Sequence, residues 1–422
     1  MKNILVLFPK DWDRAELGAP RFQRRYRFFF EGFDLFSFPS NVRLLTFDIH
    51  RFVEHLVRKY RKVGLDGVVS SNEQFGALIA AVLSHRLGLP GTDPLAIIIG
   101  QHKYYARMVA REVIPEATPP FGAFPYDIDD PADMPVAFPC FVKPVKATFS
   151  VLARRVDSFA ELRRHLTFRP FEEFIIRRLV KPFNDLMPTY TDLGVDACNM
   201  IAEGLIEGEQ FNVDGFVQGG RMHLLGVVDE VMYPGTQAFM RFEYPSRAPA
   251  ALLARIEDLT GRFLKAIGFD HGFFNVELCW NAATDALQVL EINPRLASQL
   301  ANLYRRVDGY DPYEMLFALA CGETPATRRG GGEFRTAASF VFRRFDGRAL
   351  HRTPSRSQIC SALAPFPDAA LMLYLKQGAS LAREMKWLGS YRYAVLNLGG
   401  LNTQDLFDRY ERIRQGLAFD PE

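Results

Sequence analysis

Two glutamates occur in strand-like apolar segments, where an ionised carboxylate is rarely found without a partner. Glu277 lies within the apolar run 273–278, and Glu291 directly follows Val289 and Leu290. Burial of either charge without a cation, a hydrogen-bond donor or solvent would be strongly unfavourable. The two glutamates are therefore the first candidates for a functional site.

A β-hairpin would bring these glutamates together. Residues 281–285 are typical of a turn, and a hairpin whose pairing is centred on Thr284 sets Glu277 opposite Glu291, about 5 Å apart at Cβ. Asn293 is two residues further on and shares their face, because strand side chains alternate. Two carboxylates and an amide oxygen suit a hard divalent cation such as Mg²⁺. A pair of edge carboxylates that face solvent fits the spacing equally well.

Two other stretches could bind a nucleotide. Lys143 interrupts the short apolar strand predicted within residues 138–144. Such a lysine either extends to solvent at a sheet edge or gives phosphate oxygens a fixed point charge. Residues 200–216 are typical of two strands joined by a tight turn at Gly208. Main-chain groups at that bend could hold a flat heterocycle such as adenine edge-on, although any hairpin would look alike.

The composition is that of a soluble globular protein. The chain has 422 residues, 48% hydrophobic and 24% charged, which suits two to four subdomains. A net charge of +2 gives no reason to expect a nucleic-acid partner. No apolar stretch approaches the length of a membrane helix, and the amino terminus lacks the pattern of a signal peptide. The five cysteines are odd in number and far apart, which favours a cytoplasmic protein with reduced thiols.

The elements that must position these residues begin with a strand–helix region. We expect strands at 4–8, 42–47 and 67–70 and helices at 51–62 and 74–87. This order predicts a doubly wound parallel sheet, whose ligand sites lie beyond the carboxyl ends of its strands. Residues 70–73 lie at such an end and are either a ligand site or a helix N-cap. The aromatic-rich segment 25–38 fits a core, a pocket wall or a surface for a homodimer.

The order of these motifs resembles the ATP-grasp superfamily. After the strand–helix region come Lys103, Phe138-Pro-x-x-Val-Lys-Pro, Glu203-x-x-Ile-x-Gly-x-x-Phe-x-Val-Asp-Gly, Phe274-Asn-Val-Glu and Glu291-Ile-Asn-Pro-Arg. Within the superfamily the chain is most similar to carboxylate–amine ligases such as dipeptide, carnosine and D-alanyl-D-alanine ligases, and to biotin carboxylase. The resemblance covers residues 1–325. None of these motifs is decisive alone, and their common order carries the resemblance.

The resemblance implies an α/β fold in three parts. These are a doubly wound, Rossmann-like domain at 1–95, a two-lobed α+β ATP-grasp domain at 96–325 with a lid at about 135–200, and a small carboxyl-terminal α+β unit at 326–422. Strands at 337–343 and 394–398 and a helix at 403–417 are expected in the last unit.

The resemblance also implies a role for each matching residue. The nucleotide-binding set is Lys103, Lys143, Ser150, Glu203, Gly204, Leu205, Ile206 and Gln210. In this set the two lysines and Ser150 bind phosphates, residues 203–206 bind adenine, and Gln210 binds ribose. Glu277, Glu291 and Asn293 are the implied ligands of Mg²⁺, for which Mn²⁺ could substitute. Arg295 faces the transferred phosphoryl group and is the implied catalytic residue.

Three departures from the family pattern stand out. The loop after Lys143, residues 145–152, has no glycine, although main-chain amides must approach phosphates closely. Hydroxyls of Thr148 and Ser150 or the charge of Lys146 could replace those amides. The ribose glutamate of the family falls on Gln210, or on a glutamate only if the turn shifts by one residue. Residues 296–298, Leu-Ala-Ser, replace glycines that follow the family arginine.

The implied function is an ATP-dependent carboxylate–amine ligase. A substrate carboxylate would attack ATP to give an acyl phosphate, and an amine, for example of an amino acid, would displace phosphate and leave an amide or peptide bond. An ATP-dependent carboxylase, a ligase of protein- or carrier-bound substrates, and a non-catalytic ATP-binding protein stay open. The sequence shows no general base, since His271 is typical of a turn. Candidates for substrate recognition are Glu73, Arg241, Arg305 and Arg306.

Overall fold

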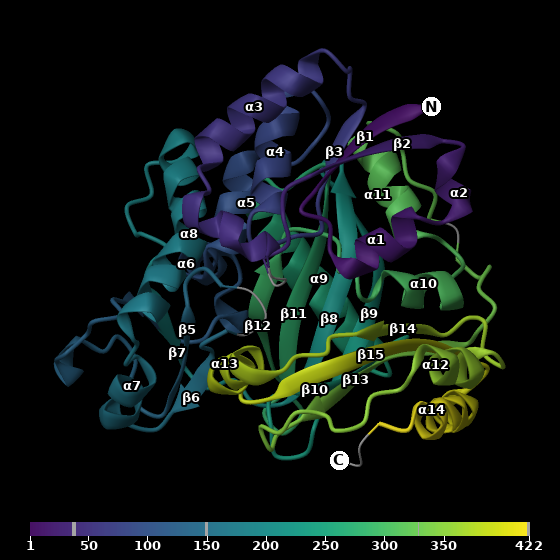
Figure 1. The fold of residues 1–422 in the computed structure, drawn as a ribbon. Coiled ribbons are helices and arrows are strands. Elements are labelled where there is room, and N and C mark those ends of the chain that lie inside the picture. The colour runs from purple at the N-terminus through teal and green to yellow at the C-terminus, as the bar shows by residue number, and fades with distance from the viewer. Residues whose placement is uncertain (36–38, 148–150, 328, 420–422) are drawn as a thin grey trace.

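The computed structural model describes residues 1–35, 39–147, 151–327 and 329–419, and its strands form three sheets (Figure 1). The first sheet is parallel, in the order β2-β1-β3, and consists of β1 (Lys2–Leu7), β2 (Tyr26–Glu31) and β3 (Gly67–Val69). Its region contains α1 (Asp11–Leu17), α2 (Pro20–Gln23), the 3₁₀ helix η1 (Ser40–Thr46), α3 (Ile49–Arg61), α4 (Gly76–Leu87) and α5 (Pro94–Gln101). The predicted helices 51–62 and 74–87 are α3 and α4.

One predicted strand of this region is wrong. Residues 42–47 fall largely in η1, and the missing strand is β2, inside the aromatic-rich segment. Phe28 packs on Phe317 with ring centroids 5.1 Å apart, and Phe29 packs on Tyr60 at 5.6 Å. Because successive strand residues point to opposite faces, these two aromatic side chains cover both faces of the strand. Phe28 and Phe29 are therefore partly buried and pack against the core on either side of the strand.

The second sheet is small and antiparallel, in the order β4-β7-β5-β6. It consists of β4 (Phe121–Phe124), β5 (Cys140–Pro144), β6 (Arg154–Val156) and β7 (Met200–Glu203), with α7 (Phe159–His165) and α8 (Pro170–Tyr190) in the same region. The chain reaches β4 through α6 (Lys103–Val113) and η2 (Pro115–Ala117), and η3 (Pro131–Asp133) precedes β5. Most of the predicted lid, residues 135–200, belongs to this small lobe.

The third sheet has eight strands in the order β12-β11-β8-β9-β10-β13-β15-β14, and its neighbouring strands are antiparallel. They are β8 (Glu209–Gln218), β9 (Arg221–Met232), β10 (Phe239–Tyr244), β11 (Gly272–Asn281), β12 (Ala286–Asn293), β13 (Thr336–Arg344), β14 (Ala370–Leu373) and β15 (Tyr391–Gly400). The helices that follow or connect them are α9 (Ala250–Ala266), α10 (Ala301–Val307), α11 (Pro312–Ala320), α12 (Arg356–Leu363), α13 (Gly378–Leu388) and α14 (Thr403–Leu417). Together the sheets confirm the predicted α/β class.

The carboxyl-terminal region has the predicted elements in an unexpected place. The strands expected at 337–343 and 394–398 lie in β13 and β15, and the helix expected at 403–417 is α14. β13 pairs with β10, however, so residues after 326 extend the large sheet instead of building one of their own (Figure 1). A strand at the edge of a sheet has unpaired main-chain N–H and C=O groups, so a later segment of the chain can pair with it and continue the sheet.

Residues 200–216 do not form the predicted hairpin. β7 pairs with β4 and β5 in the small sheet, whereas β8 pairs with β9 and β11 in the large one. Residues 204–208 therefore connect the two sheets. Gly208 has a φ of 146°, and a Cβ there would lie 2.2 Å from the carbonyl oxygen of Trp280. The chain thus requires glycine where it enters the large sheet.

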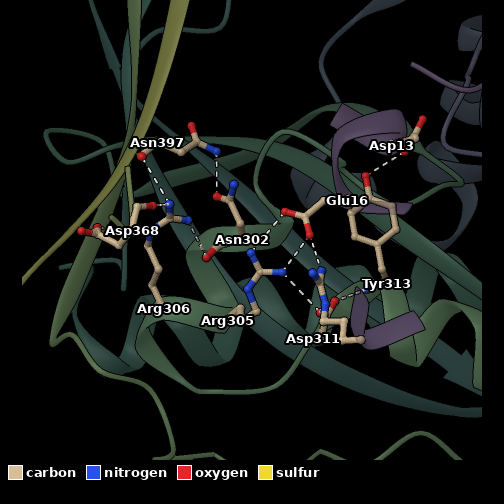
Figure 2. Close-up of polar contacts among 10 residues, drawn as sticks. Asp13, Glu16, Asn302, Arg305, Arg306, Asp311, Tyr313, Asp368 and Asn397 are labelled. Carbon is tan, nitrogen blue, oxygen red and sulfur yellow. Dashed lines mark hydrogen bonds and ion pairs between the residues drawn. The ribbon is translucent and has the colours of Figure 1, made fainter. Parts of the chain in front are cut away.

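A buried carboxylate ties the amino-terminal region to α11, which lies between β12 and β13 in the chain (Figure 2). Asp13, on α1, accepts hydrogen bonds from the Tyr313 hydroxyl at 2.7 Å, from Ser71 Oγ at 2.5 Å and from the main-chain N–H of Lys10 at 2.7 Å. Three donors compensate for the burial of its charge. Asp13 thereby fixes α1 against α11 and against the end of β3.

Two consecutive arginines of α10 hold neighbouring parts of the fold (Figure 2). Arg305 Nη1 lies 2.8 Å from Glu16 Oε2 and 3.3 Å from Asp311 Oδ2. Arg306 Nη1 donates to the carbonyl oxygen of Asn302 at 3.1 Å, and Arg306 Nη2 donates to the carbonyl of Asp368. Both guanidinium groups thus bind protein partners in this part of the fold.

Within the part of the chain that is described, no helix combines the length and the apolar character needed to cross a membrane.

Replacement of Tyr313 by Phe is expected to lower the free energy of unfolding by about 1.5–3 kcal/mol, because it removes a buried hydrogen bond to the Asp13 carboxylate. Tyr26→Phe is the matched control, since the Tyr26 hydroxyl is buried without a hydrogen-bond partner among the described residues. We expect the control not to lower stability, because it removes a buried hydroxyl that has no partner among the described residues. Urea unfolding of both variants measures the difference, and equal losses would contradict the role given to Asp13.

Candidate functional site

The two glutamates meet as predicted, but for a different reason. Glu277 lies opposite Glu291 in the antiparallel pair of β11 and β12. Nearer the turn the strands are one residue out of that register, with Asn281 opposite Ala286. The difference is a β-bulge at Leu290, which has no partner on β11. The bulge, and not the centre of the turn, brings the carboxylates face to face.

The bulge also presents a main-chain acceptor to two cations. The carbonyl oxygen of Leu290 accepts from Lys143 Nζ at 3.1 Å and from Arg107 Nη2 at 2.9 Å. The same two side chains hold Glu203: Arg107 Nε lies 2.7 Å from Oε1, and Lys143 Nζ lies 2.8 Å from Oε2. Strands β5 and β7 of the small lobe, helix α6 and strand β12 of the large lobe are therefore connected through one charged cluster.

Lys143 is an interior lysine. It lies on β5, between β7 and β6, and is 7% exposed, so the edge position that the sequence allowed is excluded. Burial by itself raises the pKa of Glu203, but the charges of Arg107 and Lys143 outweigh it and lower that pKa to about 2. Burial lowers the pKa of Lys143, although the charge of Glu203 acts in the opposite direction. Both Glu203 carboxylate oxygens are bound by side chains, and Glu203 pairs with β4 on one side and β5 on the other. Main-chain groups of residues 204–206 are therefore the candidates for ligand contacts.

Lys103 lies at the start of α6 and points to the glutamate pair. Its Nζ is 2.8 Å from Glu291 Oε1 and donates to the carbonyl oxygen of Ala147 at 3.0 Å. Burial lowers the pKa of Lys103, but the nearby carboxylate of Glu291 outweighs burial and raises it. Lys103 is therefore a fixed cation between the large lobe and the loop that follows β5.

Arg295 follows β12 and binds a residue of the amino-terminal region. Its Nη2 lies 2.9 Å from Glu73 Oε2, while its Nε is buried without a hydrogen-bond partner among the described residues. Burial raises the pKa of Glu73, but Arg295 and nearby lysines outweigh it and lower that pKa. A buried N–H without an acceptor is costly, so the Arg295 Nε marks a place for an anionic group.

The segment 70–73 supports the start of α4 and also contributes contacts to the candidate site. Asn72 Oδ1 accepts from the main-chain N–H groups of Phe75 and Gly76, so Asn72 caps α4. Glu73 points instead to Arg295, and its main-chain carbonyl accepts from Lys146 Nζ at 3.0 Å. Lys146 is buried, and burial lowers its pKa to about 8 despite the charge of Glu73. The charge of Lys146 thus lies beside Arg295 and Glu73.

Arg107 is not among the predicted site residues, and neither are most members of a polar row on the face of the large sheet that carries Glu277; Gln210 is the member that was predicted. The row consists of Gln210, Asn212 and Asp214 on β8, Glu230 on β9, and Asn275 on β11. Asn275 Nδ2 donates to Asn212 Oδ1 at 2.6 Å and to Asp214 Oδ1 at 3.1 Å. A signal existed, since polar residues at every second position of two otherwise apolar strands indicate a polar interior face.

Negative charge accumulates along this row. Burial and the charge of Glu291 raise the pKa of Glu277 to about 7, and burial raises that of Asp214 to about 6. Burial and the charges of Glu277 and Asp214 raise the pKa of Glu230 well above its usual range. Such carboxylates favour a bound proton or a cation.

The residues present fit a divalent cation. Glu277 and Glu291 supply carboxylate oxygens on adjacent strands, and Glu277 Oε1 accepts a long 3.3 Å bond from Asn293 Nδ2. The amide nitrogen of Asn293 therefore faces the glutamate, so coordination through its oxygen requires the amide to rotate. Among described residues no group of three or more His, Cys, Asp or Glu side chains is arranged to hold a metal. The predicted set needs only two carboxylates and one amide.

The remaining predicted nucleotide residues lie along the connection between the lobes. Residues 204–206 are half-buried in the segment between β7 and β8, and the Gly204 N–H already donates to the carbonyl oxygen of Pro120 at 2.8 Å. Gln210 is half-buried on β8, opposite Glu230. Ser150, and Thr148 with it, lies outside the described residues.

Two other candidates are not brought to this site. Arg241 is paired with Glu243 and lies over the ring of Phe407. His271 has a φ of 49° and is in the turn before β11, as expected for a turn histidine. With Arg305 and Arg306 also bound elsewhere, Glu73 is the substrate candidate that the fold brings to the glutamate pair.

Comparisons with known proteins agree with this geometry. A family model described as the ATP-grasp domain matches residues 136–302. An L-amino acid ligase from Bacillus licheniformis has a TM-score of 0.73 at 15% identity, covering 100% of this chain and 99% of that one. N5-carboxyaminoimidazole ribonucleotide synthetase from Thermotoga maritima has a TM-score of 0.63 at 15% identity, with 100% of both chains covered. Biotin carboxylase from Campylobacter jejuni has a TM-score of 0.61 at 12% identity, covering 99% and 92%.

A search of curated proteins by sequence gave no match. At the identities found, the solved structures establish a common fold, and the domain model identifies the segment that holds β5, β7, β8, β11 and β12. Residues 136–302 therefore match the ATP-grasp domain, and the whole chain shares its fold with these solved structures.

Proposed function

We propose that the chain is an ATP-dependent carboxylate–amine ligase that forms an amide or peptide bond through an acyl phosphate and releases ADP and phosphate. One observation carries the proposal. Lysines of α6 and β5, the opposed glutamates of β11 and β12, and Arg295 converge between two lobes although they come from distant segments. Phosphoryl transfer depends mainly on positioning and charge neutralisation, and this set supplies both.

The nucleotide in this proposal lies between the lobes. Main-chain groups of residues 204–206 take the adenine edge, and Lys103 and Lys143 take the phosphates. The loop after Lys143 lacks glycine, and Lys146 compensates with a buried ammonium group. The same proposal assigns residues 96–325 to the ATP-grasp domain, with the small lobe as a lid that excludes water from the reactive acyl phosphate.

Glu277, Glu291 and Asn293 would hold Mg²⁺ or Mn²⁺, which neutralises phosphate charge when bound. Occupation by a cation would also relieve the repulsion that raises the pKa of Glu277. Lys103, now bonded to Glu291, is close enough to bridge that carboxylate and a phosphate oxygen.

Arg295 holds the transferred phosphoryl group in this mechanism. The substrate carboxylate forms a bond to the terminal phosphorus of ATP as the bond to ADP breaks. Arg295 Nε, which is buried without a partner among the described residues, then donates to a phosphoryl oxygen. Glu73 orients the guanidinium through its 2.9 Å contact. The amine finally attacks the acyl carbon, loses its proton and displaces phosphate.

The substrates of this proposal are a small carboxylic acid and a small amine. An L-amino acid ligase shares the fold over the whole chain, which makes amino acids the first choice for both. A biotin carboxylase shares it as well, so bicarbonate belongs among the carboxylates that are tested.

Phosphate release from MgATP is expected to require a particular pair of carboxylate and amine. A panel of amino acids and small carboxylic acids, offered singly and in pairs, identifies the pair, and mass spectrometry identifies the amide. Glu291→Ala should abolish release, because it removes a carboxylate from the cation site and the partner of Lys103. Glu257→Ala, on the exposed face of α9, should not. Nucleotide binding without turnover for every pair would contradict the ligase and favour an ATP-binding protein.

Nucleotide affinity is expected to fall as the pH rises through about 8, where Lys146 loses its charge. The pKa of this lysine is lowered, so the ammonium form that attracts phosphate is present below that pH and absent above it. Lys146→Arg keeps its charge. Between about pH 7 and about pH 9.5 the wild type should therefore lose roughly tenfold more nucleotide affinity than this variant loses. Titration calorimetry with ADP measures both proteins. Parallel pH profiles would show that Lys146 does not contact the phosphates.

A further inference from the structure

We infer that Arg343 and Arg392 bind a carboxylate of the substrates that does not react. The inference rests on the proposed function and deepens it, because it names the substrate class. Either the amine is an amino acid that keeps its own carboxylate, or the acid is a dicarboxylic acid. The inference arises from two arginines of the large sheet that lie opposite each other without an acidic partner among the described residues.

A second β-bulge sets the two arginines opposite each other. Arg343 of β13 is paired with Arg392 of β15, and the bulge leaves Tyr393 without a partner on β13. Directly opposed residues of an antiparallel pair lie about 5 Å apart at Cβ, and like charges in that position are destabilising. An anion bound between the two guanidinium groups would remove this repulsion.

The partners of the two arginines are neutral. Arg343 Nε donates to the carbonyl oxygen of Phe239 at 3.2 Å, and Arg343 Nη1 donates to Ser390 Oγ at 2.9 Å. The guanidinium carbon of Arg392 lies 4.3 Å from the ring centroid of Tyr374, and this guanidinium has no hydrogen bond or ion pair within the described chain. Burial and the charge of Arg392 lower the pKa of Arg343 to about 10. Both side chains are half-buried, so water screens their charges only in part.

Two carboxylates lie near the pair, but neither forms an ion pair with it in the part of the chain that is described. Glu384 is paired with Lys376 instead. Asp11 is exposed at the start of α1. The positive charge of the two arginines is therefore available to a ligand, and paired guanidinium groups suit a carboxylate because each can donate two parallel hydrogen bonds.

The pair faces the candidate site. Val341 is two residues before Arg343 and lies on the same face of β13. It is buried in the apolar cluster that contains Leu296, the residue that follows Arg295. The tyrosine ring next to Arg392 packs against the same cluster. Arg343 and Arg392 therefore belong to the face of the large sheet from which Arg295 extends.

Lys10 connects the pair to the catalytic arginine. Burial lowers the pKa of Lys10 to about 8, and the charges of Arg295 and Arg392 add to this effect, so both arginines are close to Lys10. Positive charge thus continues from the place of the reacting carboxylate at Arg295 to the pair. A second carboxylate of the substrates would be attracted along this path.

Turnover with matched substrates tests the inference on the full chain. Each amino acid is offered as the amine beside its carboxamide, and succinate and glutarate are offered as the acid beside their monoamides. In one of the two series the free carboxylate should raise kcat/KM at least about tenfold, because it gains charge-assisted hydrogen bonds. The series that responds identifies which substrate carries the carboxylate.

Arg392→Gln should bring this ratio close to one, mainly through KM, because the lost contact is made to the substrate and to the transition state alike. Arg392→Lys keeps a charge but loses the paired donors, so it should give an intermediate ratio. Both variants should fold like the wild type, since the Arg392 guanidinium has no hydrogen-bond partner among the described residues, and their melting temperatures check this.

Arg344→Gln is the matched control. Arg344 follows Arg343 on β13, points to the opposite face and is bonded to Asp346, so its loss should leave the ratio unchanged. A ratio close to one for the wild type in both series, or a wild-type ratio in Arg392→Gln, would overturn the inference. Equal losses for free and amidated substrates would also overturn it, because Arg392 would then have only a structural role. No turnover with any pair would refute the proposed function and, with it, this inference.

Discussion

The central constraint of this structure is the placement of two glutamates on adjacent buried strands. Glu277 and Glu291 repel each other, and the fold accepts that cost because Lys103 is bonded to one of them and a cation site fits between both. The bulge at Leu290 sets this arrangement. It restores the register of the pair and turns a carbonyl oxygen toward Lys143 and Arg107, so one irregular residue shapes both the acidic and the basic side of the site.

The two lobes depend on each other through a second buried charge. Glu203 belongs to the small lobe, yet the cations that neutralise it also bind the main chain of the large lobe. Removal of Glu203 would leave two buried cations without the carboxylate that both contact. The amino-terminal region contributes in the same manner, since Glu73 reaches Arg295 and Asp13 is fixed by α11. Three distant segments are therefore needed to complete one site.

Most of what the sequence predicted rests on local pattern. Helices α3 and α14 follow from apolar periodicity and N-caps, and α4 follows from a long apolar run that ends at Gly88. Glu277 and Glu291 do meet, but the bulge at Leu290 sets their pairing. The wrong predictions concern segments whose structure depends on which other segment of the chain they pair with. Residues 42–47 look like a strand but have no neighbouring strand, and residues 200–216 look like a hairpin although β7 and β8 pair in different sheets. Pairing between distant strands is not encoded in the spacing of one segment.

The sequence by itself determined the order of motifs, the residue types of the candidate site and the α/β class, because these depend on side-chain chemistry and on short-range periodicity. Only the tertiary structure decided that Arg107 and Lys143 share Glu203 and that Glu73 holds Arg295. It also decided that Glu230 faces Gln210, with one oxygen that has no hydrogen-bond partner among the described residues. Each of these contacts joins residues that are distant in the chain or lie on strands whose register a bulge can shift. Their partners are set by how the sheets and lobes pack, and that packing is a property of the whole chain.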